Sequence, residues 1–485
     1  MADLAPLLEH LLRRAGFGIG AAEVDRFRRV SYPVAVDDLL TFDIPSADVD
    51  SHIGTPGYVG ITTSGQFSPN TAINDARQRW LFRLVHSPAP LLEKMALFWH
   101  EHFATAYSKI SGIVGTTDGT RMLAAKPSED PGGARGQLEL FRQYALGNFR
   151  DLLLQVAQDP AMLVWLDGRL NTKNNPQENF GRELMELFTV GVQNYVETDV
   201  YAAARVFTGW NMTTTGDRGT PSAYYTFSYN ASVHETSPKT FSFPIYPDGS
   251  HTIPARSAAA GMQDGIDLIN ALAFHPATAR RLAGKLWVWF VDEVNAPDSA
   301  FVDSIAATYL QRGAEMSQVV AAVLSSPQFM DSSRYFMRYS WPAEFVARSL
   351  KEVGYLGFSV NDALTPMVNM GQQLFEPPDV AGWDLGPAWF STARMLARMN
   401  FAAVLATNQK FALRDQAQPY TLTPETLVNH VVSTLNVPTP ASDVYGALTS
   451  YVSAGGPWSG SAPQLLAKTG GLFHLLVGSA DYQFV

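Results

Sequence analysis

The segment from Asn174 to Trp210 concentrates residue types that could do chemistry. At helical spacing, Glu183 and Glu186 fall three residues apart on the polar side of an amphipathic helix, next to Arg182. Helical bundles use carboxylates at this spacing as inward metal ligands, and such a pair can also serve as acid and base, with an arginine to orient it. A simpler interpretation is an exposed ion pair between Arg182 and Glu186, with Glu178 as a helix cap. The sequence leaves both interpretations open.

A second candidate is the run His100-Glu101-His102 at the end of another predicted helix. Side chains two residues apart on a helix point about 200° away from each other, so His100 and His102 cannot bind one metal ion together. His102 falls on the apolar face of this helix, so we expect it to point inward and His100 to point elsewhere. An inward histidine is usually a hydrogen-bonded core residue, and the alternative is a ligand or general base.

Two loop regions supply the other candidates. Residues 211–260 are rich in Thr, Ser, Pro and Gly, which predicts a loop insertion with His234 on a flexible surface segment. Residues 375–390 have too many Pro and Gly for a helix and predict a structured loop that lies beside the helix of Glu183 and helps to form the main cleft. The candidate substrate-binding residues of this loop are Trp383, Trp389 and Asp379.

The chain contains no cysteine, so any metal site must use histidine nitrogen and carboxylate oxygen. The predicted ligands of a divalent metal ion are His102, Glu183 and Glu186. The predicted catalytic residues are Arg182, Glu183, Glu186 and His234, with Arg182 binding an anionic group or intermediate.

Helical periodicity through most of the chain predicts a mainly α protein. We expect one large helical domain, residues 1–485, with an irregular, partly β insertion at 211–260 and a C-terminal helical extension at 408–485. The helix of Glu183 should begin at Asn175 and end near Gly191, with Leu184 and Leu187 buried. A later helix, from residue 277 to 291, should carry its basic residues on the outer side: Arg280, Arg281 and Lys285.

Charge and hydropathy exclude several partners. The formal net charge of −10 argues against a nucleic-acid or anionic-membrane surface, which would need clustered Lys and Arg. No uncharged apolar segment reaches the length of about 18 residues that a membrane span requires. The start of the chain shows no signal peptide, so we expect a soluble chain or a mature form whose leader was removed, and localisation stays open.

Several segments together resemble the bacterial family known as domain of unknown function 1800. The matching phrases, in the order of the family, are LRRAGFG, ALFWHEHFAT, ALGNFRDLLLQVAQDPAMLVWLD, ENFGRELMELFTVGVQNYVETDV, AARVFTGW, HPATARRLAGKLWVWFV, FEPPDVAGWD and FSTARMLARMNFA. They span roughly residues 10–405 of the sequence. One departure is visible, because relatives commonly have Asn between the two histidines where this chain has Glu101.

The resemblance implies an exported type of bacterial protein, since members often carry a leader. It also implies a sulfatase-like or phosphatase-like partner, because genes of such a family tend to accompany these. Two function classes follow. One is a metal-dependent enzyme acting on an envelope or extracellular saccharide-type substrate. The other is a non-catalytic saccharide-binding or protein-assembly partner of an exported hydrolase.

Overall fold

The computed structural model describes residues 4–44 and 47–485 and confirms a mainly α protein. The first part of the chain forms α1 (Pro6–Ala15), α2 (Ala21–Phe27), α3 (Tyr32–Leu40), α4 (Ile73–His86), α5 (Pro90–His102), α6 (Tyr107–Val114), α7 (Thr116–Ala124), α8 (Gln137–Gln143), α9 (Phe149–Ala157) and α10 (Pro160–Trp165). The middle forms α11 (Asn179–Glu183), α12 (Glu197–Val206), α13 (Met262–Ala273), α14 (Pro276–Leu286), α15 (Ser299–Gln311), α16 (Met316–Leu324), α17 (Pro327–Met330), α18 (Pro342–Val353) and α19 (Asn361–Asn369). The last part forms α20 (Thr392–Asn408), α21 (Lys410–Ala417), α22 (Pro424–Thr434), α23 (Ser442–Ser453) and α24 (Ala462–Val477).

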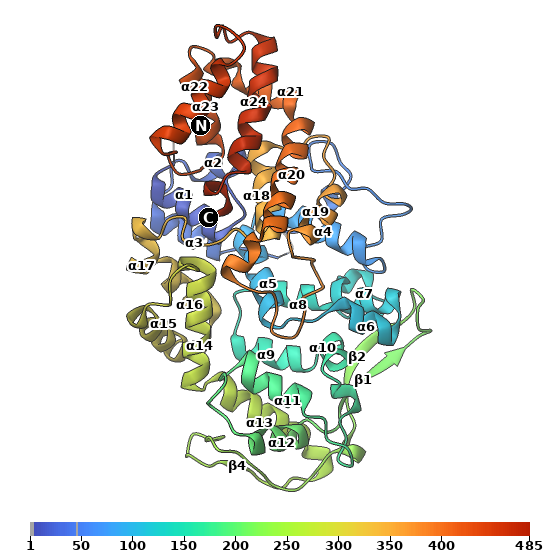
Figure 1. Cartoon of the computed structure of the whole chain (residues 1–485). Coiled ribbons are helices and arrows are strands. Elements are labelled where there is room, and N and C mark those ends of the chain that lie inside the picture. The colour runs from blue at the N-terminus through green and yellow to red at the C-terminus, as the bar shows by residue number, and fades with distance from the viewer. Residues whose placement is uncertain (1–3, 45–46) are drawn as a thin grey trace.

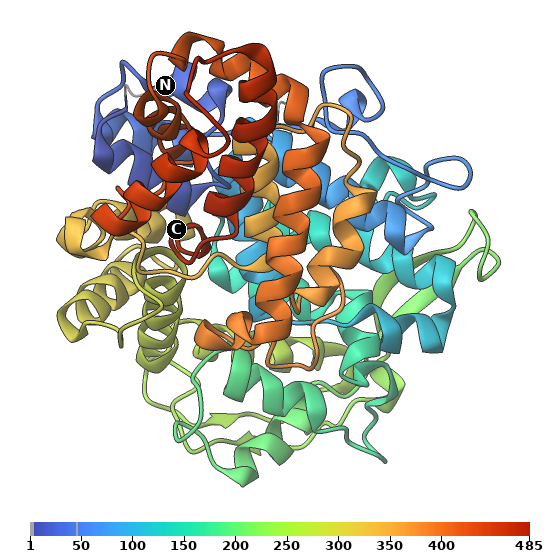
Figure 2. The same ribbon diagram turned by 45° about the horizontal axis from the view of Figure 1, so that its top comes forward.

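The helices are arranged around α5. In Figure 1 the N-terminal helices (blue) and the C-terminal helices (red) share one end of the molecule, and the green segment with α12 and α13 forms the other end. Figure 2 shows the same arrangement from a second direction. Between these ends, α5 packs against α1, α3, α4 and α8. The run of candidate residues at the end of α5 therefore lies in the interior, between segments that are far apart in the sequence.

Strand structure among the described residues is confined to the segment after α12, where the sequence predicted a partly β insertion. β1 (Trp210–Thr215) pairs antiparallel with β2 (Tyr224–Tyr229), in register Trp210 to Tyr229. β3 (Lys239–Thr240) pairs with β4 (Thr252–Ile253). β1 and β2 lie against α10, and β3 lies against α12.

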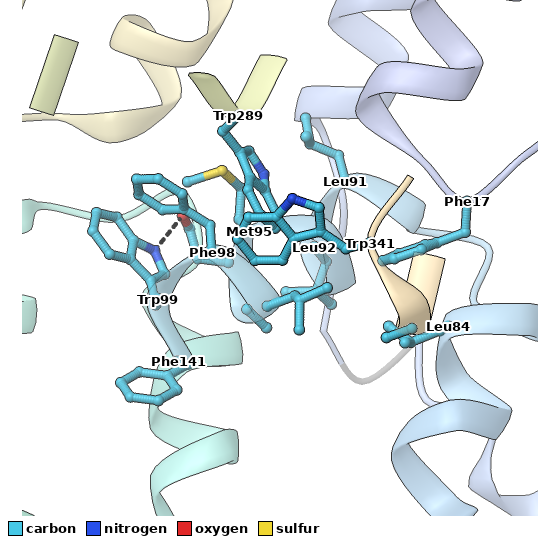
Figure 3. Packing of buried hydrophobic residues seen from close by; sticks show 14 of the residues in the cluster. Phe17, Leu84, Leu91, Leu92, Met95, Phe98, Trp99, Phe141, Trp289 and Trp341 are labelled. Carbon is cyan, nitrogen blue, oxygen red and sulfur yellow. Dashed lines mark hydrogen bonds between the residues drawn. The ribbon is translucent and has the colours of Figure 1, made fainter. Parts of the chain in front are cut away.

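The core around α5 is shown in Figure 3. The aliphatic and aromatic side chains drawn on α5 pack between Trp289 and Trp341 on one side and Phe141 of α8 on the other. The Trp289 and Trp341 rings meet edge to face at 4.8 Å. Trp99 is fully buried and its indole N–H donates to the carbonyl of Ala145 at 3.0 Å. This packing fixes the rotation of α5 about its axis, and with it the direction of each side chain in its last turn.

All residues of α5 except Glu101 are buried. The burial extends to charged groups, which take partners of opposite charge: Glu93 accepts from Arg142 at 2.9 Å, and Lys94 pairs with Glu344 of α18. The charged residues of such a helix do not by themselves mark its exposed side. Glu101, the exception, is the residue of α5 that reaches solvent.

The helix of Glu183 differs from the prediction at both ends. It begins at Asn179 rather than Asn175, because the chain from Thr172 to Asn175 turns back on itself in an isolated β-bridge. After Glu183 it widens into a π-helical turn, Leu184–Phe188. Leu184 is buried as expected, whereas Leu187 is only partly buried. Gly191 does end the unit, with φ of +84° and its N–H bonded to the carbonyl of Met185.

The C-terminal helices are tied to the centre of the molecule. α24 packs against α20 and α21. Arg348 of α18 donates to the backbone carbonyls of Tyr482 and Phe484, near the end of the chain. These contacts join residues 408–485 to the rest, although the assignment of 1–485 to one domain stays a prediction. Across residues 4–44 and 47–485, no helix is both long enough and apolar enough to cross a membrane.

Candidate functional site

A pocket of about 560 Å³ lies at the end of α5. Its walls come from five segments: the end of α5, α14 with the π-helical turn that follows it (Trp287–Val291), the π-helical turn at Leu187, Trp341 just before α18, and the loop at 380–385. The lining residues are Phe98, Glu101, His102, Leu187, Arg281, Gly284, Lys285, Val288, Trp289, Trp341, Val380, Ala381, Trp383, Asp384 and Leu385. The pocket is therefore mostly apolar, with a small group of ionisable side chains, which is the usual make-up of a small-molecule site.

Glu101 is held against the loop by the backbone of Gly382 and Trp383. The Trp383 N–H donates to its Oε2 at 3.1 Å. Gly382 has φ of +94°, and a Cβ there would lie 2.4 Å from Oε1. Burial raises the pKa of Glu101 to about 8, while the Trp383 N–H and Lys285 act in the opposite direction. The carboxyl group thus keeps its proton at neutral pH more readily than an ordinary glutamate does.

Lys285 faces the same pocket and is positioned by His102. The Nε2 of His102 lies 3.1 Å from the carbonyl oxygen of Phe188, which can only accept, so Nε2 carries the ring proton. Nδ1 is then the acceptor in the neutral ring, and Lys285 Nζ donates to it at 3.0 Å. Burial, together with Lys285 and Arg281, lowers the pKa of His102 well below its ordinary value, so the ring is neutral.

The amine of Lys285 is also shifted toward neutrality. Burial lowers its pKa to about 8, Arg281 acts in the same direction, and Glu101 acts against both. Arg281 precedes Lys285 by four residues, so the two side chains share one face of α14. The guanidinium donates through Nε and Nη2 to the carbonyl of Leu187, both at 3.3 Å. Arg281 therefore gives the α14 side of the pocket its positive charge, in the same pocket as the carboxyl group of Glu101.

Both π-helical turns border the pocket. Leu187 belongs to the first, and Val288 and Trp289 belong to the second. A π turn changes the hydrogen-bond pattern from i→i−4 to i→i−5 and is often found at functional sites. In the second turn, the N–H of Asp292 bonds to the carbonyl of Trp287 at 3.0 Å. In the first, the turn ends at Phe188, whose carbonyl is free to accept from His102.

Two glycines of this site should respond to substitution in opposite directions. Gly284 lies inside α14, and a Cβ there meets nothing within 4 Å. We expect Gly284→Ala to raise the free energy of unfolding by about 0.5–1 kcal/mol, because alanine loses less backbone entropy in a helix. Gly382→Ala should lower it by about 1–3 kcal/mol, because of the positive φ and the clash with Glu101. Urea unfolding of both variants checks the pair, and equal effects would contradict the geometry.

The predicted carboxylate cluster lies outside the pocket. Arg182 donates to Glu197 at 2.6 Å and to Glu178 at 3.2 Å, rather than to Glu186. Glu186 instead accepts from the hydroxyl of Tyr195. Burial, together with Glu186, raises the pKa of Glu183. Arg182 therefore does form an ion pair, as the simpler interpretation predicted, but with Glu197 and Glu178 rather than with Glu186.

The structure does not bring His102, Glu183 and Glu186 together as a ligand set. Among residues 4–44 and 47–485, no group of three or more His, Asp or Glu side chains is placed to hold a metal ion. The nitrogens of His102 are engaged, one as a donor to Phe188 and one beside the cationic Lys285. A cation at Nδ1 would have to displace Lys285, so the donor chemistry does not favour a metal here. The predicted metal stays a prediction.

His234 is buried rather than placed on a flexible surface segment, so that expectation was wrong. Its Nδ1 lies 2.8 Å from the carbonyl of Thr208 and its Nε2 lies 3.3 Å from Asp264. Asp264 also accepts from Lys239 and Arg256. The insertion is thus anchored to α13 by a buried charged network, and His234 is not among the residues that line the pocket.

The loop of Trp383 does form the pocket, as expected, but its tryptophans do not present open faces. Trp383 is 5% exposed and Trp389 is 1% exposed. Trp383 lines the pocket and Trp389 lines a neighbouring one of about 240 Å³. Asp379 stabilises the loop, accepting from the N–H of Ala381 at 2.8 Å. Leu187 and residues 380–385 line one pocket, so the loop and the helical unit of Glu183 do meet at this cleft.

Sequence reasoning missed Lys285 and Arg281 and left Glu101 without a role. The basic residues of α14 were expected on its outer side, but Lys285 and Arg281 point into the pocket. Their i, i+4 spacing was the signal that could have linked them. His100, expected to point away from His102, does so, but it is also buried and accepts from the N–H of Phe375 at 3.2 Å.

Comparisons with known proteins identify a family and no activity. Neither the curated proteins nor the solved structures contain a match to this chain. One family model, described as "Protein of unknown function (DUF1800)", matches residues 10–484. That range takes in every residue of the pocket, and the chain belongs to this family.

Proposed function

We propose that the protein is an enzyme that moves protons to and from a small polar substrate bound in the pocket at the end of α5. The observation that carries this proposal is the pair Glu101 and Lys285. Both line one pocket, and burial moves the pKa of each to about 8 from opposite directions. Pairs of groups whose environments shift them toward the working pH are typical of acid–base catalysis.

The roles follow from the two protonation states. Within the described residues, no ion pair within 4.0 Å joins Glu101 to Lys285, so a substrate can lie between them. The protonated carboxyl group supplies a proton as general acid, and the neutral amine accepts one as general base. Because the two groups influence each other, they titrate as a unit rather than separately. His102 holds the amine in place and does not itself exchange a proton.

A volume of about 560 Å³ suits a small molecule rather than a polymer chain. Arg281 favours a substrate with an anionic group over a divalent cation. A monosaccharide unit of an envelope saccharide would fit this description, and the saccharide substrate, the metal ligands His102, Glu183 and Glu186, and a sulfatase-like partner all stay predictions. The binding-protein alternative depends on stacking faces at Trp383 and Trp389, which are packed inside the protein.

The test is turnover of a substrate panel by matched variants. Wild type, Glu101→Gln, Lys285→Met and Gly284→Leu are incubated with monosaccharides, 2-oxo acids and aldehydes, and the substrates are followed by ¹H NMR. Leucine at Gly284 fills the pocket without backbone strain, since a Cβ there points into open space. Gly446→Leu, at another open helical glycine in α23, is the matched control.

We expect one class of compound to be converted, with a bell-shaped pH profile centred near pH 8. Glu101→Gln and Lys285→Met should each lower kcat/KM by about 10²–10⁴-fold. Gly284→Leu should abolish turnover, while Gly446→Leu leaves it intact. Turnover that survives all three pocket variants would place the activity elsewhere and refute the proposal.

A further inference from the structure

Lys285 is partly buried and differs from Lys94 and Lys239, the lysines that are fully buried in the described part of the chain. Lys94 pairs with Glu344, and Lys239 pairs with Asp264 at 2.6 Å. Lys285 has no carboxylate within 4.0 Å among residues 4–44 and 47–485, and its hydrogen-bond partner is the neutral ring of His102. Arg281, four residues earlier on the same face of α14, lines the same pocket. A desolvated amine next to another cationic group is how proteins make lysine a nucleophile.

The approach to this amine is open. Lys285 lines the pocket together with Gly284, where no side chain occupies the adjoining space. The bond to Nδ1 of His102 uses one N–H of the amine and orients the nitrogen. Arg281 lies one helical turn before Lys285, and no carboxylate within 4.0 Å pairs with it in the described residues. Its guanidinium can therefore meet an anionic group of a bound molecule.

We propose that Lys285 attacks the carbonyl carbon of an aldehyde or ketone substrate that carries a carboxylate or phosphate, and forms an imine with it. This inference deepens the proposed function and rests on it. The substrate lies with its carbonyl carbon at Nζ of Lys285, its oxygen toward Glu101 and its anionic group at Arg281.

The step balances with the groups present. The lone pair of the neutral amine forms the C–N bond, the carbonyl π electrons move to oxygen, and that oxygen takes the proton of Glu101. The Glu101 carboxylate then removes a proton from nitrogen, which gives a neutral carbinolamine. Glu101 returns this proton to the hydroxyl group, the C–O bond breaks, and water leaves as the nitrogen lone pair forms C=N. The products are an iminium ion on Lys285, the Glu101 carboxylate and one water, with no oxidant or reductant required.

The experiment traps the imine by reduction. The full chain is incubated near pH 8 with sodium cyanoborohydride and either glyoxylate, which is anionic, or acetaldehyde, which is neutral. Modified lysines are then located by peptide mass spectrometry. Lys285→Arg and Gly284→Leu are the test variants, and Lys468→Arg, at a surface lysine that stacks on Tyr451, is the matched control. Circular dichroism establishes that each variant is folded.

We expect glyoxylate to label Lys285 before any other lysine, and to leave Lys285→Arg and Gly284→Leu unlabelled while Lys468→Arg is labelled as in wild type. Arg281→Gln should lower the ratio of glyoxylate to acetaldehyde labelling by about tenfold, the loss of one ion pair of ~1.4 kcal/mol. Labelling spread over surface lysines, with Lys285 no faster than the rest, would overturn the inference. If turnover is lost in Glu101→Gln and Lys285→Met but no probe labels Lys285, the imine is refuted and the acid–base function stands. If Lys285 is labelled but turnover survives both substitutions, the proposed function fails instead.

Discussion

Glu344→Gln is expected to lower the free energy of unfolding by about 3–5 kcal/mol, the cost of leaving buried charges without their partner. Glu344 lies in the first turn of α18 and is buried. Its carboxylate accepts two hydrogen bonds from Nη1 of Arg338, at 2.8 and 2.7 Å, and pairs with Lys94 of α5. Burial alone would raise the pKa of Glu344, but Arg338 and Lys94 outweigh it and hold the pKa below its usual range.

Glutamine keeps the size and an acceptor for the Trp341 N–H, which bonds to the carboxylate at 3.2 Å, but it removes the negative charge. The guanidinium group of Arg338 then lies in the core without the carboxylate that accepts from it. Lys94 can lose its proton, because burial already lowers its pKa to about 7. Glu344 acts to raise this pKa, so in the variant Lys94 loses its proton below pH 7. The deficit should therefore shrink as the pH rises toward about 7 and stay constant above it, where Lys94 is neutral in both folded proteins.

Urea unfolding at about pH 5, pH 7 and pH 8 measures both effects. The matched control is Asp303→Asn, which removes the carboxylate of an ion pair with Arg280 whose side chains are 54% and 60% exposed. We expect that change to stay within about 0.5 kcal/mol. Equal costs for Glu344→Gln and Asp303→Asn would show that the α5–α18 ion pair does not stabilise the core.

The sequence predicted those elements whose residues follow one regular period. The apolar face of α5 was recognised from its 3.6-residue spacing, and His102 was correctly placed inward. The aromatic loop at 375–390 was recognised from its Pro and Gly, and its residues 380–385 line the cleft as expected. These features depend on local spacing and composition, which a single sequence contains.

The site was predicted only in part because its geometry depends on breaks in that period. A helical wheel assumes constant rotation per residue, and the π-helical turn from Leu184 to Phe188 changes it. Glu186 accepts from Tyr195, while Arg182 donates to Glu197, so the two do not pair directly although Tyr195 lies near both. Leu187 is turned from the core to the pocket wall for the same reason.

Lys285 and Glu101 were missed for a different physical reason. A polar stripe on a helix is normally the solvent side, and only the tertiary fold brings α5, residues 380–385 and Leu187 over that stripe of α14. Other charged residues of α5, such as Glu93 and Lys94, are buried, so charge alone could not show that Glu101 is the exposed one. Long-range contacts of this kind leave no periodic trace in the sequence.

Glu101→Gln should remove the fall in the free energy of unfolding that Glu101 causes in wild type as pH rises from about 4.5 to about 8. The folded-state pKa of Glu101 is about 8, against an ordinary value of 4.5. Between these values the unfolded chain has lost the proton and the folded chain keeps it, so wild-type stability falls as pH rises from about 4.5 to about 8. At about 1.4 kcal/mol for each pKa unit, and allowing for the partial exposure of the carboxylate, the loss is about 2–4 kcal/mol.

Lys285 acts in the opposite direction and at higher pH. Its pKa is lowered from 10.5 to about 8, so between these values the unfolded chain binds the proton and stability rises with pH. The contribution of Glu101 and Lys285 to the free energy of unfolding of wild type therefore has a minimum near pH 8. Glutamine at position 101 can still accept the Trp383 N–H, but it removes the charge that helps Lys285 to keep its proton. In the variant, the rise in stability with pH that Lys285 causes should then begin below pH 8.

Urea unfolding of wild type and Glu101→Gln at about pH 5, 6, 7 and 8 measures the difference. We expect the variant to be equal to wild type or slightly less stable at pH 5, where both carry a neutral group, and more stable by about 2–4 kcal/mol at pH 8. Asp303→Asn, whose carboxylate is exposed, should show no such trend. A difference between Glu101→Gln and wild type that is the same at pH 5 and pH 8 would mean that Glu101 ionises as an ordinary carboxyl group. The acid–base function would then lose the observation on which it depends, because an ordinary carboxylate facing Lys285 would hold its amine protonated at neutral pH.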